Sequence, residues 1–390
     1  MFQSRRDAAH DLSVAVYLYQ PGDGGLDRVA ILLANHLLRR GVAVELWMAR
    51  PDGAAAHLID PALTVRIVPA PDGARRLSMI AQCPALVRMV RRHRPDILYS
   101  AGNQSNMLVA LATLGTDTRA VSRISNPIVR PGQHGAGAWG RLLRFRAIAR
   151  LSDLTIVMGD HDRALLHQSG DVRLLPRPTV TPGMERACAA RARRCPSDPW
   201  RLLMVGRLTR QKDQATALEA LARLRHRDWR LTIAGQGPLR ADLERRCVAL
   251  GIADRVDFAG YIGCPDRLAT LMAQADLLLQ PSRWEGLCAT LIEAMACGAD
   301  VVATDCTPNV RSLLADGGQH PVTPVGDAGA FARAIERVMA RPAPDRLRAA
   351  AIAGHRVDSA LDSYLAAFAG LVGVRISQPV PPSMASPVLS

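Results

Sequence analysis

Apolar residues along this chain alternate between short continuous runs and longer stretches in which they recur at helical spacing. Continuous runs of about four to eight apolar residues are typical of buried strands in a parallel sheet, and helical spacing indicates the helices that cover it. In the first half, this pattern predicts strands at 12–19, 42–48, 65–68, 97–100, 120–124 and 154–158, and helices at 26–40, 77–93, 105–114 and 138–150. The alternation predicts a mostly parallel sheet covered by helices.

The pattern breaks between Pro176 and Pro199, where five prolines and a cluster of arginines indicate a linker. A second series then predicts strands at 201–205, 229–234, 256–258, 277–280 and 301–304, and helices at 214–225, 239–250, 267–274 and 287–296. We therefore predict two α/β domains, residues 1–180 and 200–357, joined by a linker at 181–199. A further helix is expected in residues 358–374, and the Pro- and Ser-rich residues 375–390 are expected to be disordered.

Composition narrows the class of protein. Hydrophobic residues make up 48% of the 390 residues, which is typical of a globular protein, and no run of about 18 apolar residues predicts a membrane span. The N-terminal residues lack the small-residue cleavage site of a signal peptide, so we expect a cytoplasmic protein. The eight cysteines include no C-x-x-C pair, which favours reduced thiols over a disulfide framework or a metal site.

The chain is strongly basic, with a net charge of +14, and the excess is concentrated in the N-terminal half. Such a balance suits a polyanionic or membrane-surface partner. The stretch 139–150 mixes large apolar residues with four arginines, so it is either a helix on an anionic bilayer or a core face with solvated arginines. Aromatic residues make up only 4% of the chain and no nucleic-acid module is recognisable, which argues against nucleic acid as the partner.

The stretch from Pro281 to Gly298 carries the strongest chemical signal. Glu285 lies in a glycine-containing turn, and Glu293 lies eight positions later in an apolar helix, roughly 12 Å further along the helix axis. Between them are the backbone N–H groups of a helix N-terminus, which bind anions readily. A carboxylate for sugar hydroxyls, amides for a diphosphate and a second carboxylate for a ribose would together match a nucleotide sugar.

A second signal is a single lysine. Of the 49 basic residues only Lys212 is lysine, and it lies in the loop that follows the strand predicted at 201–205. A compact ammonium can contact a diphosphate where a planar guanidinium does not fit. Arg207 lies in the same loop, so two cations stand close together in the sequence. Gly24 and Gly25 follow the first strand and open a helix, where they either form a tight turn or let a phosphate or an acceptor approach the backbone.

These segments resemble a known family. The segment at 281–298 resembles the E-x7-E motif of retaining glycosyltransferases with the GT-B fold, in particular the large family four. Residues 206–213 resemble that family's phosphate-binding loop, residues 24–29 its glycine-rich first loop, and residues 234–239 and 303–306 are similar to further family segments. The resemblance implies two Rossmann-like, doubly wound domains that face each other across a cleft. It also implies that the helix in residues 358–374 crosses back to the first domain.

The resemblance implies roles for particular residues. The expected catalytic residues are Glu285, Arg207 and Lys212. The expected donor-binding residues are Gly24, Gly25, Arg207, Lys212, Tyr261, Ile262, Glu285, Gly286, Leu287, Cys288, Ala289 and Glu293. We expect neither a metal nor a cofactor, because two cations and a helix N-terminus would neutralise the diphosphate. Relatives commonly carry a histidine after the fifth strand, and whether Asn126 replaces it here stays open.

The sequence therefore predicts a retaining hexosyltransferase. It would move a hexose or N-acetylhexosamine from a nucleoside-diphosphate sugar, UDP-sugar rather than GDP-sugar, to a lipid-linked or polysaccharide acceptor in bacterial surface glycan synthesis, including lipopolysaccharide. We expect it in the cytoplasm or peripherally on the inner face of the cytoplasmic membrane. Two alternatives stay open: a sugar-nucleotide epimerase of the same fold, and a basic nucleic-acid-binding protein.

Overall fold

The structure, a computed structural model, describes residues 12–22, 24–71, 81–129, 133–192, 195, 198–314, 320–341 and 345–374. The chain forms two sheets and divides into two compact units. Unit 1 comprises Met1–Arg123, Ile148–Thr155 and Leu361–Ser390, and unit 2 comprises Ile124–Ala147 and Ile156–Ala360. The tail predicted to be disordered, 375–390, lies outside the described residues.

The first sheet has seven strands in the order β3-β2-β1-β4-β5-β6-β7. Its strands are β1 (Ser13–Leu18), β2 (Ala43–Met48), β3 (Thr64–Ile67), β4 (Ile97–Ser100), β5 (Arg119–Arg123), β6 (Leu154–Val157) and β7 (Val172–Leu174). The strands β3, β2, β1, β4 and β5 pair in parallel, as the apolar runs predict. The helices between them are α1 (Gly25–Arg39), α3 (Cys83–His93), α4 (Asn106–Thr113), α5 (Gly135–Leu151) and α6 (Asp160–Leu166).

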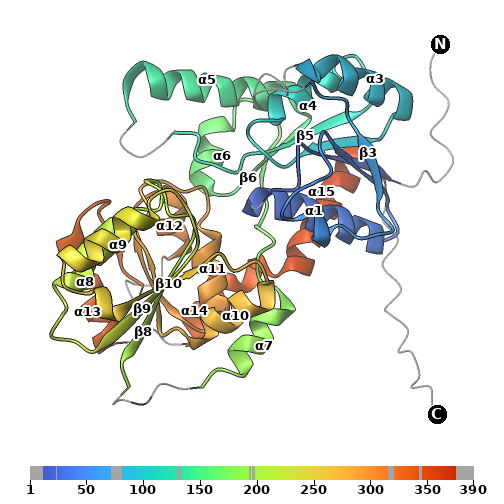
Figure 1. Ribbon diagram of the computed structural model, residues 1–390. Coiled ribbons are helices and arrows are strands. Elements are labelled where there is room, and N and C mark those ends of the chain that lie inside the picture. Colours follow the sequence, from blue (N-terminus) through green and yellow to red (C-terminus); the bar gives the residue numbers. More distant parts are fainter. Residues whose placement is uncertain are drawn as a thin grey trace, which may run out of the picture. The chain divides into compact units, whose positions relative to one another are not determined.

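Helices α3 and α4 pack on one face of this sheet, where Tyr17, Trp47 and Leu98 form a shared core with Leu86 and other residues of the two helices (Figure 1). The predicted helix at 77–93 begins in the structure at Cys83, and residues 72–80 lie outside the described part.

The C-terminal helix α15 (Val357–Val372) belongs to unit 1 from Leu361 onward. Its Tyr364 and Phe368 rings pack against Tyr99 of β4, with ring centroids 6.3 and 5.7 Å from the Tyr99 ring. Arg123, at the end of β5, is fully buried and donates from Nε to the Tyr364 hydroxyl over 3.0 Å. A buried hydrogen bond to a charged group thus joins the last helix to the middle of the first sheet.

The second sheet has six parallel strands in the order β10-β9-β8-β11-β12-β13. These strands are β8 (Trp200–Val205), β9 (Trp229–Ala234), β10 (Val256–Gly260), β11 (Leu277–Gln280), β12 (Asp300–Thr304) and β13 (Val322–Thr323). One face is covered by α8 (Gln214–Ala222), α9 (Arg240–Ala249) and α13 (Ala328–Ala340). The other face is covered by α7 (Pro182–Ala189), α10 (Pro265–Gln274), α11 (Ala289–Ala296), α12 (Pro308–Leu313) and α14 (Asp345–Ile352), as Figure 1 shows.

Successive residues of one strand supply the two cores on either side of this sheet. In β11, Leu277 and Leu279 contribute to the core under α8 and α13, and Leu278 contributes to the core under α10 and α11. A strand that is covered on both faces needs an apolar side chain at every position. This requirement explains why the strands of the second half read as continuous apolar runs.

The predicted linker at 181–199 contains a helix. Thr181 accepts a hydrogen bond from the Met184 N–H and so caps the N-terminus of α7, which packs against α10. Pro182 is the first residue of α7, a position where its missing N–H costs nothing. The boundaries predicted at 180 and 200 both fall within unit 2.

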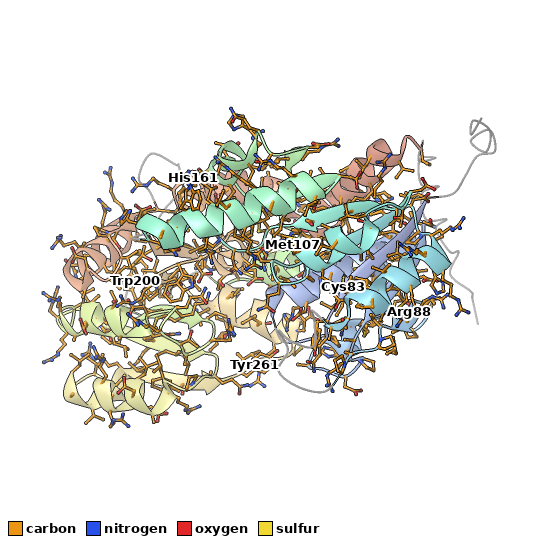
Figure 2. The ribbon with its side chains drawn as sticks, turned by 90° about the horizontal axis from the view of Figure 1, so that it is seen from above. Cys83, Arg88, Met107, His161, Trp200 and Tyr261 are labelled. Atoms are coloured by element: carbon orange, nitrogen blue, oxygen red, sulfur yellow. The ribbon has the colours of Figure 1, made fainter. Side chains whose placement is uncertain are left out.

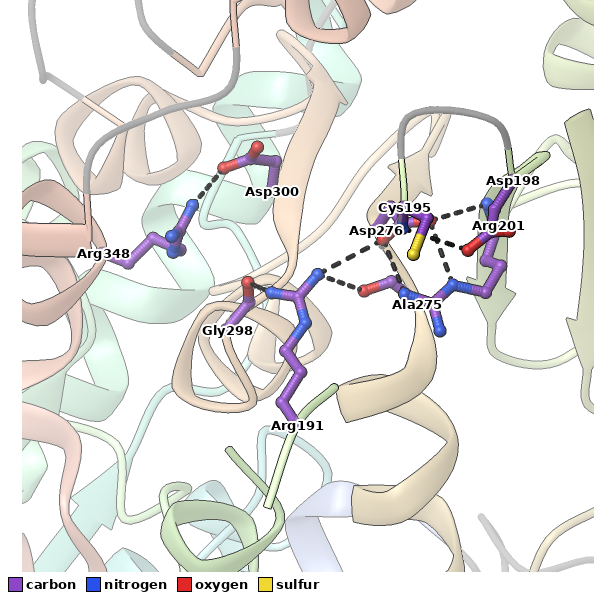
Figure 3. A network of polar contacts seen from close by, with 9 residues as sticks. All are labelled: Arg191, Cys195, Asp198, Arg201, Ala275, Asp276, Gly298, Asp300 and Arg348. Carbon is purple, nitrogen blue, oxygen red and sulfur yellow. Dashed lines mark hydrogen bonds and ion pairs between the residues drawn. The ribbon is translucent and has the colours of Figure 1, made fainter. Parts of the chain in front are cut away.

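A polar network holds the residues after α7 against the second sheet (Figure 3). Arg191 donates to the backbone carbonyls of Gly298 and Ala275, and its guanidinium lies 3.5 Å from the Asp276 carboxylate. Asp276, which is buried at the start of β11, also accepts from Arg201 over 2.8 Å. These contacts lie at the amino ends of the strands.

Candidate functional site

The predicted donor-site loops follow two neighbouring strands of the second sheet. Strands β8 and β11 are adjacent, with β9 and β10 continuing on one side and β12 and β13 on the other. The strand order therefore reverses between β8 and β11, and doubly wound sheets bind ligands outside the carboxyl ends of the strands at such a reversal. The loop at 206–213 follows β8 and the loop at 281–288 follows β11, so both flank this point.

Lys212 and Glu285 form an ion pair at this reversal. The Lys212 Nζ atom lies 2.7 Å from Oε1 of Glu285, whose exposed fraction is only 8%. Ser282 donates to the same oxygen over 2.8 Å, and Gln280 Nε2 lies 3.4 Å from it. All three contacts go to Oε1, so Oε2 has no hydrogen bond within the part of the chain that the structure describes. The sequence analysis placed Lys212 and Glu285 in one site, and the structure brings them into direct contact.

The surroundings of Lys212 favour its charged form. Burial acts to lower the pKa of Lys212, but the raising effects of the Glu285 carboxylate and of the nearby Cys288 and Cys306 together outweigh burial, and the net pKa is raised. The lysine is therefore held as an ammonium throughout the neutral range. The ammonium of Lys212 is buried, and within the described residues only one oxygen of the Glu285 carboxylate is hydrogen-bonded. An ionic ligand can bind here by replacing some of these contacts with its own.

Further contacts, which the sequence analysis missed, join the two loops. The Arg283 N–H donates to the Gln211 carbonyl over 2.8 Å, and Gln211 Nε2 donates to the Trp284 carbonyl over 3.0 Å. The guanidinium of Arg283 also lies 3.0 Å from the carboxylate of Asp213, which occupies the left-handed region with a φ of 46°. The conformation of each loop therefore depends on the other loop, and no local sequence pattern shows this.

Two glycines let the loop after β9 press against the loop after β8. A Cβ on Gly235 would lie 2.0 Å from the Gly206 carbonyl oxygen, and one on Gly237 would lie 2.4 Å from that of Leu208. Gly235 also has a φ of 151°, which side chains other than glycine rarely adopt. This close backbone contact explains the Gly-x-Gly segment at 235–237.

The N-terminus of α11 is the predicted anion site. Its N-cap residue is Cys288, and no side chain caps the helix, so the N–H groups of the first turn are not satisfied by a capping side chain. Gly286, Leu287 and Cys288 are buried, and Ala289 is half-buried at the first turn. The binding of a phosphate by these amides stays a prediction.

Glu293 lies in the second turn of α11 and is partly exposed, whereas Leu291, Ile292 and Ala294 around it are buried. The sequence analysis placed Glu293 in an apolar helix, and in the structure the helix around it is buried while Glu293 itself is partly exposed. The role of Glu293 toward a ribose stays a prediction.

The remaining predicted residues are more exposed. Arg207 is exposed, and within the described residues its side chain has no hydrogen bond or ion pair. Tyr261, in the loop after β10, is 45% exposed, and Ile262 beside it is half-buried. Gly24 and Gly25 belong to unit 1, where Gly24 is the N-cap of α1 with an ordinary φ of −72°. The Gly24 backbone therefore does not require glycine.

Asn126, which stands where relatives commonly have a histidine, is exposed in the segment after β5. Its proposed replacement of that histidine stays open.

An Asp-x-Asp sequence occurs at residues 160–162. There Asp160 pairs with Arg163 over 2.8 Å, and burial raises the pKa of Asp162. No group of three or more potential metal ligands occurs among the described residues. Within the same residues, no helix has both the length and the apolar character to cross a bilayer.

Two family models match the two halves of the chain. Residues 23–181 match the model described as Glycosyltransferase Family 4, and residues 189–355 match the model described as Glycosyl transferases group 1. The second match contains the Lys212–Glu285 pair and the α11 N-terminus, and the first contains the glycine-rich loop after β1.

Named proteins that are similar to this chain are glycosyltransferases as well. The chain is 36% identical over 169 residues to a GDP-mannose-dependent alpha-(1-6)-phosphatidylinositol dimannoside mannosyltransferase of Mycobacterium tuberculosis, an alignment that covers 42% of each protein. It is 27% identical over 324 residues to the lipopolysaccharide core biosynthesis glycosyltransferase LpsE of Rhizobium meliloti, covering 82% of this chain and 86% of the relative.

Among solved structures, Anabaena Alr3699/HepE in complex with UDP superposes with a TM-score of 0.73 and 17% identity, covering 92% of this chain and 100% of that one. The lipopolysaccharide outer core galactosyltransferase WaaB superposes with a TM-score of 0.69 and 17% identity, covering 92% of this chain and 99% of that one. At this identity the likeness shows the fold alone, and the predicted fold class is confirmed. Both halves of the chain thus match glycosyltransferase family models, and its two Rossmann-like domains have the GT-B fold.

Proposed function

We propose that this protein is a glycosyltransferase that uses a nucleoside-diphosphate sugar. The observation that carries the proposal is the Lys212–Glu285 ion pair at the point where the strand order of the second sheet reverses. The half of the chain that contains the pair matches the group 1 glycosyltransferase model. A lysine held as an ammonium beside an uncapped helix N-terminus suits a diphosphate, and a buried carboxylate suits sugar hydroxyls.

The donor would enter by exchange of partners. Its diphosphate would take hydrogen bonds from Lys212 and from the first-turn amides of α11, with Arg207 closing on it from the exposed side. Glu285 would keep Ser282 and turn its Oε2 atom toward a sugar hydroxyl. Each new contact is charge-assisted, and such bonds are roughly twice as strong as neutral ones. In this arrangement no metal is needed to neutralise the diphosphate.

The reaction would break the bond between the anomeric carbon and the phosphate oxygen and form one from that carbon to an acceptor hydroxyl oxygen. The leaving diphosphate would take the electron pair, and its oxygen would accept the acceptor's proton. We propose attack on the same face that the leaving group departs from, which retains the anomeric configuration. Lys212 and the α11 amides would stabilise the charge that develops on the leaving group.

For the donor we propose a UDP-linked hexose or N-acetylhexosamine, and for the acceptor a lipid-linked or polysaccharide glycan of a bacterial surface. The UDP complex of Anabaena Alr3699/HepE and the name of the LpsE relative support these choices. The GDP-mannose in the name of the mycobacterial relative makes GDP-sugars the comparison to include.

Thermal unfolding with UDP- and GDP-sugars tests donor binding. A ligand at 100 times its dissociation constant adds about 2.7 kcal/mol to the free energy of unfolding, so a bound donor raises the melting temperature measurably. We expect Lys212→Ala and Glu293→Ala each to abolish this rise. The control is Arg337→Ala, which removes an exposed cation from α13 and should leave the rise unchanged. A donor-induced rise that survives in both site variants would mean that the donor pocket is elsewhere.

Product analysis separates transfer from epimerisation. An epimerase would convert its donor without any acceptor, whereas a transferase would release nucleoside diphosphate only when sugar passes to an acceptor or to water. The proton NMR coupling of the anomeric proton in the product reports its configuration. An inverted product would refute same-face attack while leaving the donor site intact.

A further inference from the structure

A groove of about 630 Å³ lies at the outer edge of the first sheet, between the edge strand β3 and helix α3. Its walls include Val65, Arg66 and Ile67 from β3 and Arg88, Met89 and Arg92 from α3. We call it the β3–α3 groove. All of its residues belong to unit 1, whereas Lys212 and Glu285 belong to unit 2, so the proposed donor site does not explain it.

The floor of the groove is apolar and open. Val65 and Ile67 are 40% and 50% exposed, and as residues two positions apart in one strand they point to the same face of the sheet. Met89, half-buried on α3, lies beside them. Helix α3 buries its own apolar face against the core through Leu86 and Val90, and among the described residues it leaves Val65 and Ile67 of β3 largely uncovered. Apolar side chains on an uncovered edge strand are a liability unless a partner covers them.

The rim of the groove is cationic. Arg88 and Arg92 are four residues apart, so their side chains lie on the same side of α3, and both are exposed. Neither forms a hydrogen bond or an ion pair with another residue in the described part of the chain. Figure 2 shows Arg88 on the outer surface of α3.

The other basic residues of the groove contribute little charge. The Arg66 guanidinium is held by Glu45 through two hydrogen bonds of 2.6 and 2.7 Å, so its charge is compensated. Burial, with help from the Arg66 charge, lowers the pKa of His93 and favours its neutral form. The net positive charge of the groove therefore comes from Arg88 and Arg92.

We propose that the β3–α3 groove binds an anionic phospholipid, with the lipid phosphate between Arg88 and Arg92 and the first methylenes of a chain over Val65, Ile67 and Met89. Two uncompensated arginines on one side of a helix can both donate charge-assisted hydrogen bonds to a phosphate, and the adjoining apolar floor can bury methylenes of an acyl chain. Nucleic acid would need a longer track of cations and aromatic rings on which bases could stack, and the groove has neither. The inference rests on unit 1 alone and does not depend on the proposed function.

Vesicle co-sedimentation of the full-length protein tests the charged half of this inference. Binding to vesicles of phosphatidylcholine with phosphatidylglycerol should exceed binding to phosphatidylcholine alone and should weaken with salt. In Arg88→Gln/Arg92→Gln we expect the affinity for the anionic vesicles to fall about 25-fold, because each arginine near an anionic surface contributes roughly fivefold. The matched control is Arg333→Gln/Arg337→Gln, an exposed pair with the same spacing on α13 of unit 2. Equal losses in the two double variants would show only a general charge effect and would overturn the proposal.

A second variant tests the apolar half. Ile67→Ser keeps the charge, changes a half-exposed side chain, and should weaken binding about fivefold through lost chain contact. Soluble dihexanoyl phosphatidylglycerol should compete with the vesicles, and glycerol phosphate at the same concentration should not. Competition by glycerol phosphate alone, or unchanged binding of Ile67→Ser, would overturn the lipid assignment in favour of a simple phosphate site. An acidic peptide that displaces the protein as well as the short-chain lipid does would overturn it in favour of a protein partner.

Discussion

Replacing Lys212 by methionine should destabilise unit 2, because Glu285 would remain buried without its countercharge. Removing one partner of a buried ion pair costs about 3–5 kcal/mol. The side chains of Lys212 and Glu285 are 18% and 11% exposed, and Ser282 still donates to the carboxylate in the variant. Partial hydration and this remaining hydrogen bond place our expectation below that range, at about 2–3 kcal/mol. Methionine keeps most of the lysine's volume, so little of the loss comes from a cavity.

The double variant separates the charge from the packing. In Lys212→Met/Glu285→Gln the unpaired charge is gone, and the amide oxygen can still accept from Ser282. We therefore expect this protein to be more stable than Lys212→Met alone, with a coupling energy between the two positions of about 1.5–2 kcal/mol. Urea unfolding followed by tryptophan fluorescence measures each midpoint and slope.

The pH dependence adds a check with a definite sign. The folded-state pKa of Lys212 is raised, so the stabilisation is fully present below the pKa of an unfolded lysine and is lost as the pH rises through the higher folded value. The difference between wild type and Lys212→Met should therefore stay constant through neutral pH and shrink only in the alkaline range. Identical urea midpoints at neutral pH, or free-energy losses that simply add in the double variant, would refute the reasoning.

Three other predictions concern packing and protonation. Tyr364→Phe removes the hydroxyl that accepts from a buried guanidinium and should cost about 1.5–3 kcal/mol by calorimetry, whereas Tyr99→Phe removes a buried hydroxyl without a hydrogen-bond partner among the described residues and should be near neutral. A large loss in Tyr99→Phe as well would mean that ring packing, not the hydrogen bond, is being measured. Gly235→Ala places a Cβ 2.0 Å from a backbone carbonyl oxygen, so it should lower the free energy of unfolding by more than about 2 kcal/mol and weaken donor binding. Gly41 has a φ of 75° and a Cβ there would meet nothing within 4 Å, so Gly41→Ala should lower it by only about 1 kcal/mol. Similar costs for the two glycines would contradict the close contact. Burial lowers the pKa of His355 in the folded protein, so the unfolded histidine takes up a proton first. The free energy of unfolding should therefore fall as the pH drops below about 6.5. In urea titrations at several pH values, His355→Gln should remove part of this pH dependence. An unchanged slope in His355→Gln would assign the effect to other groups.

The strands were the most predictable part of the fold. The strand predicted at 97–100 is β4, and the one predicted at 277–280 is β11, because a strand covered on both faces must be apolar throughout. Short polar elements were not predicted: α6 begins with charged residues, and β7 has three residues. Helix α7 was taken for part of a linker because Pro182 was read as a breaker, although proline also begins helices.

Composition and spacing in the sequence pointed to residues of the candidate site, but not to the contacts between them. The rarity of lysine drew attention to Lys212, and the spacing of two carboxylates drew attention to Glu285. Their 2.7 Å ion pair joins residues 73 positions apart and depends on β8 lying beside β11, which no local pattern encodes. The sequence likewise placed Glu293 in an apolar helix, but which side of that helix is covered depends on the neighbours that pack on it.

The Arg191 contacts bear on how the second sheet could be prepared as a separate protein. A fragment that starts at Trp200, where the sequence alone would place the boundary, would lose α7 and would leave the carbonyls of Ala275 and Gly298 without their guanidinium donor. One that starts just before Thr181 would keep the capped helix and this donor together. Of the two fragments, the longer one should express in more soluble form and resist proteases for longer.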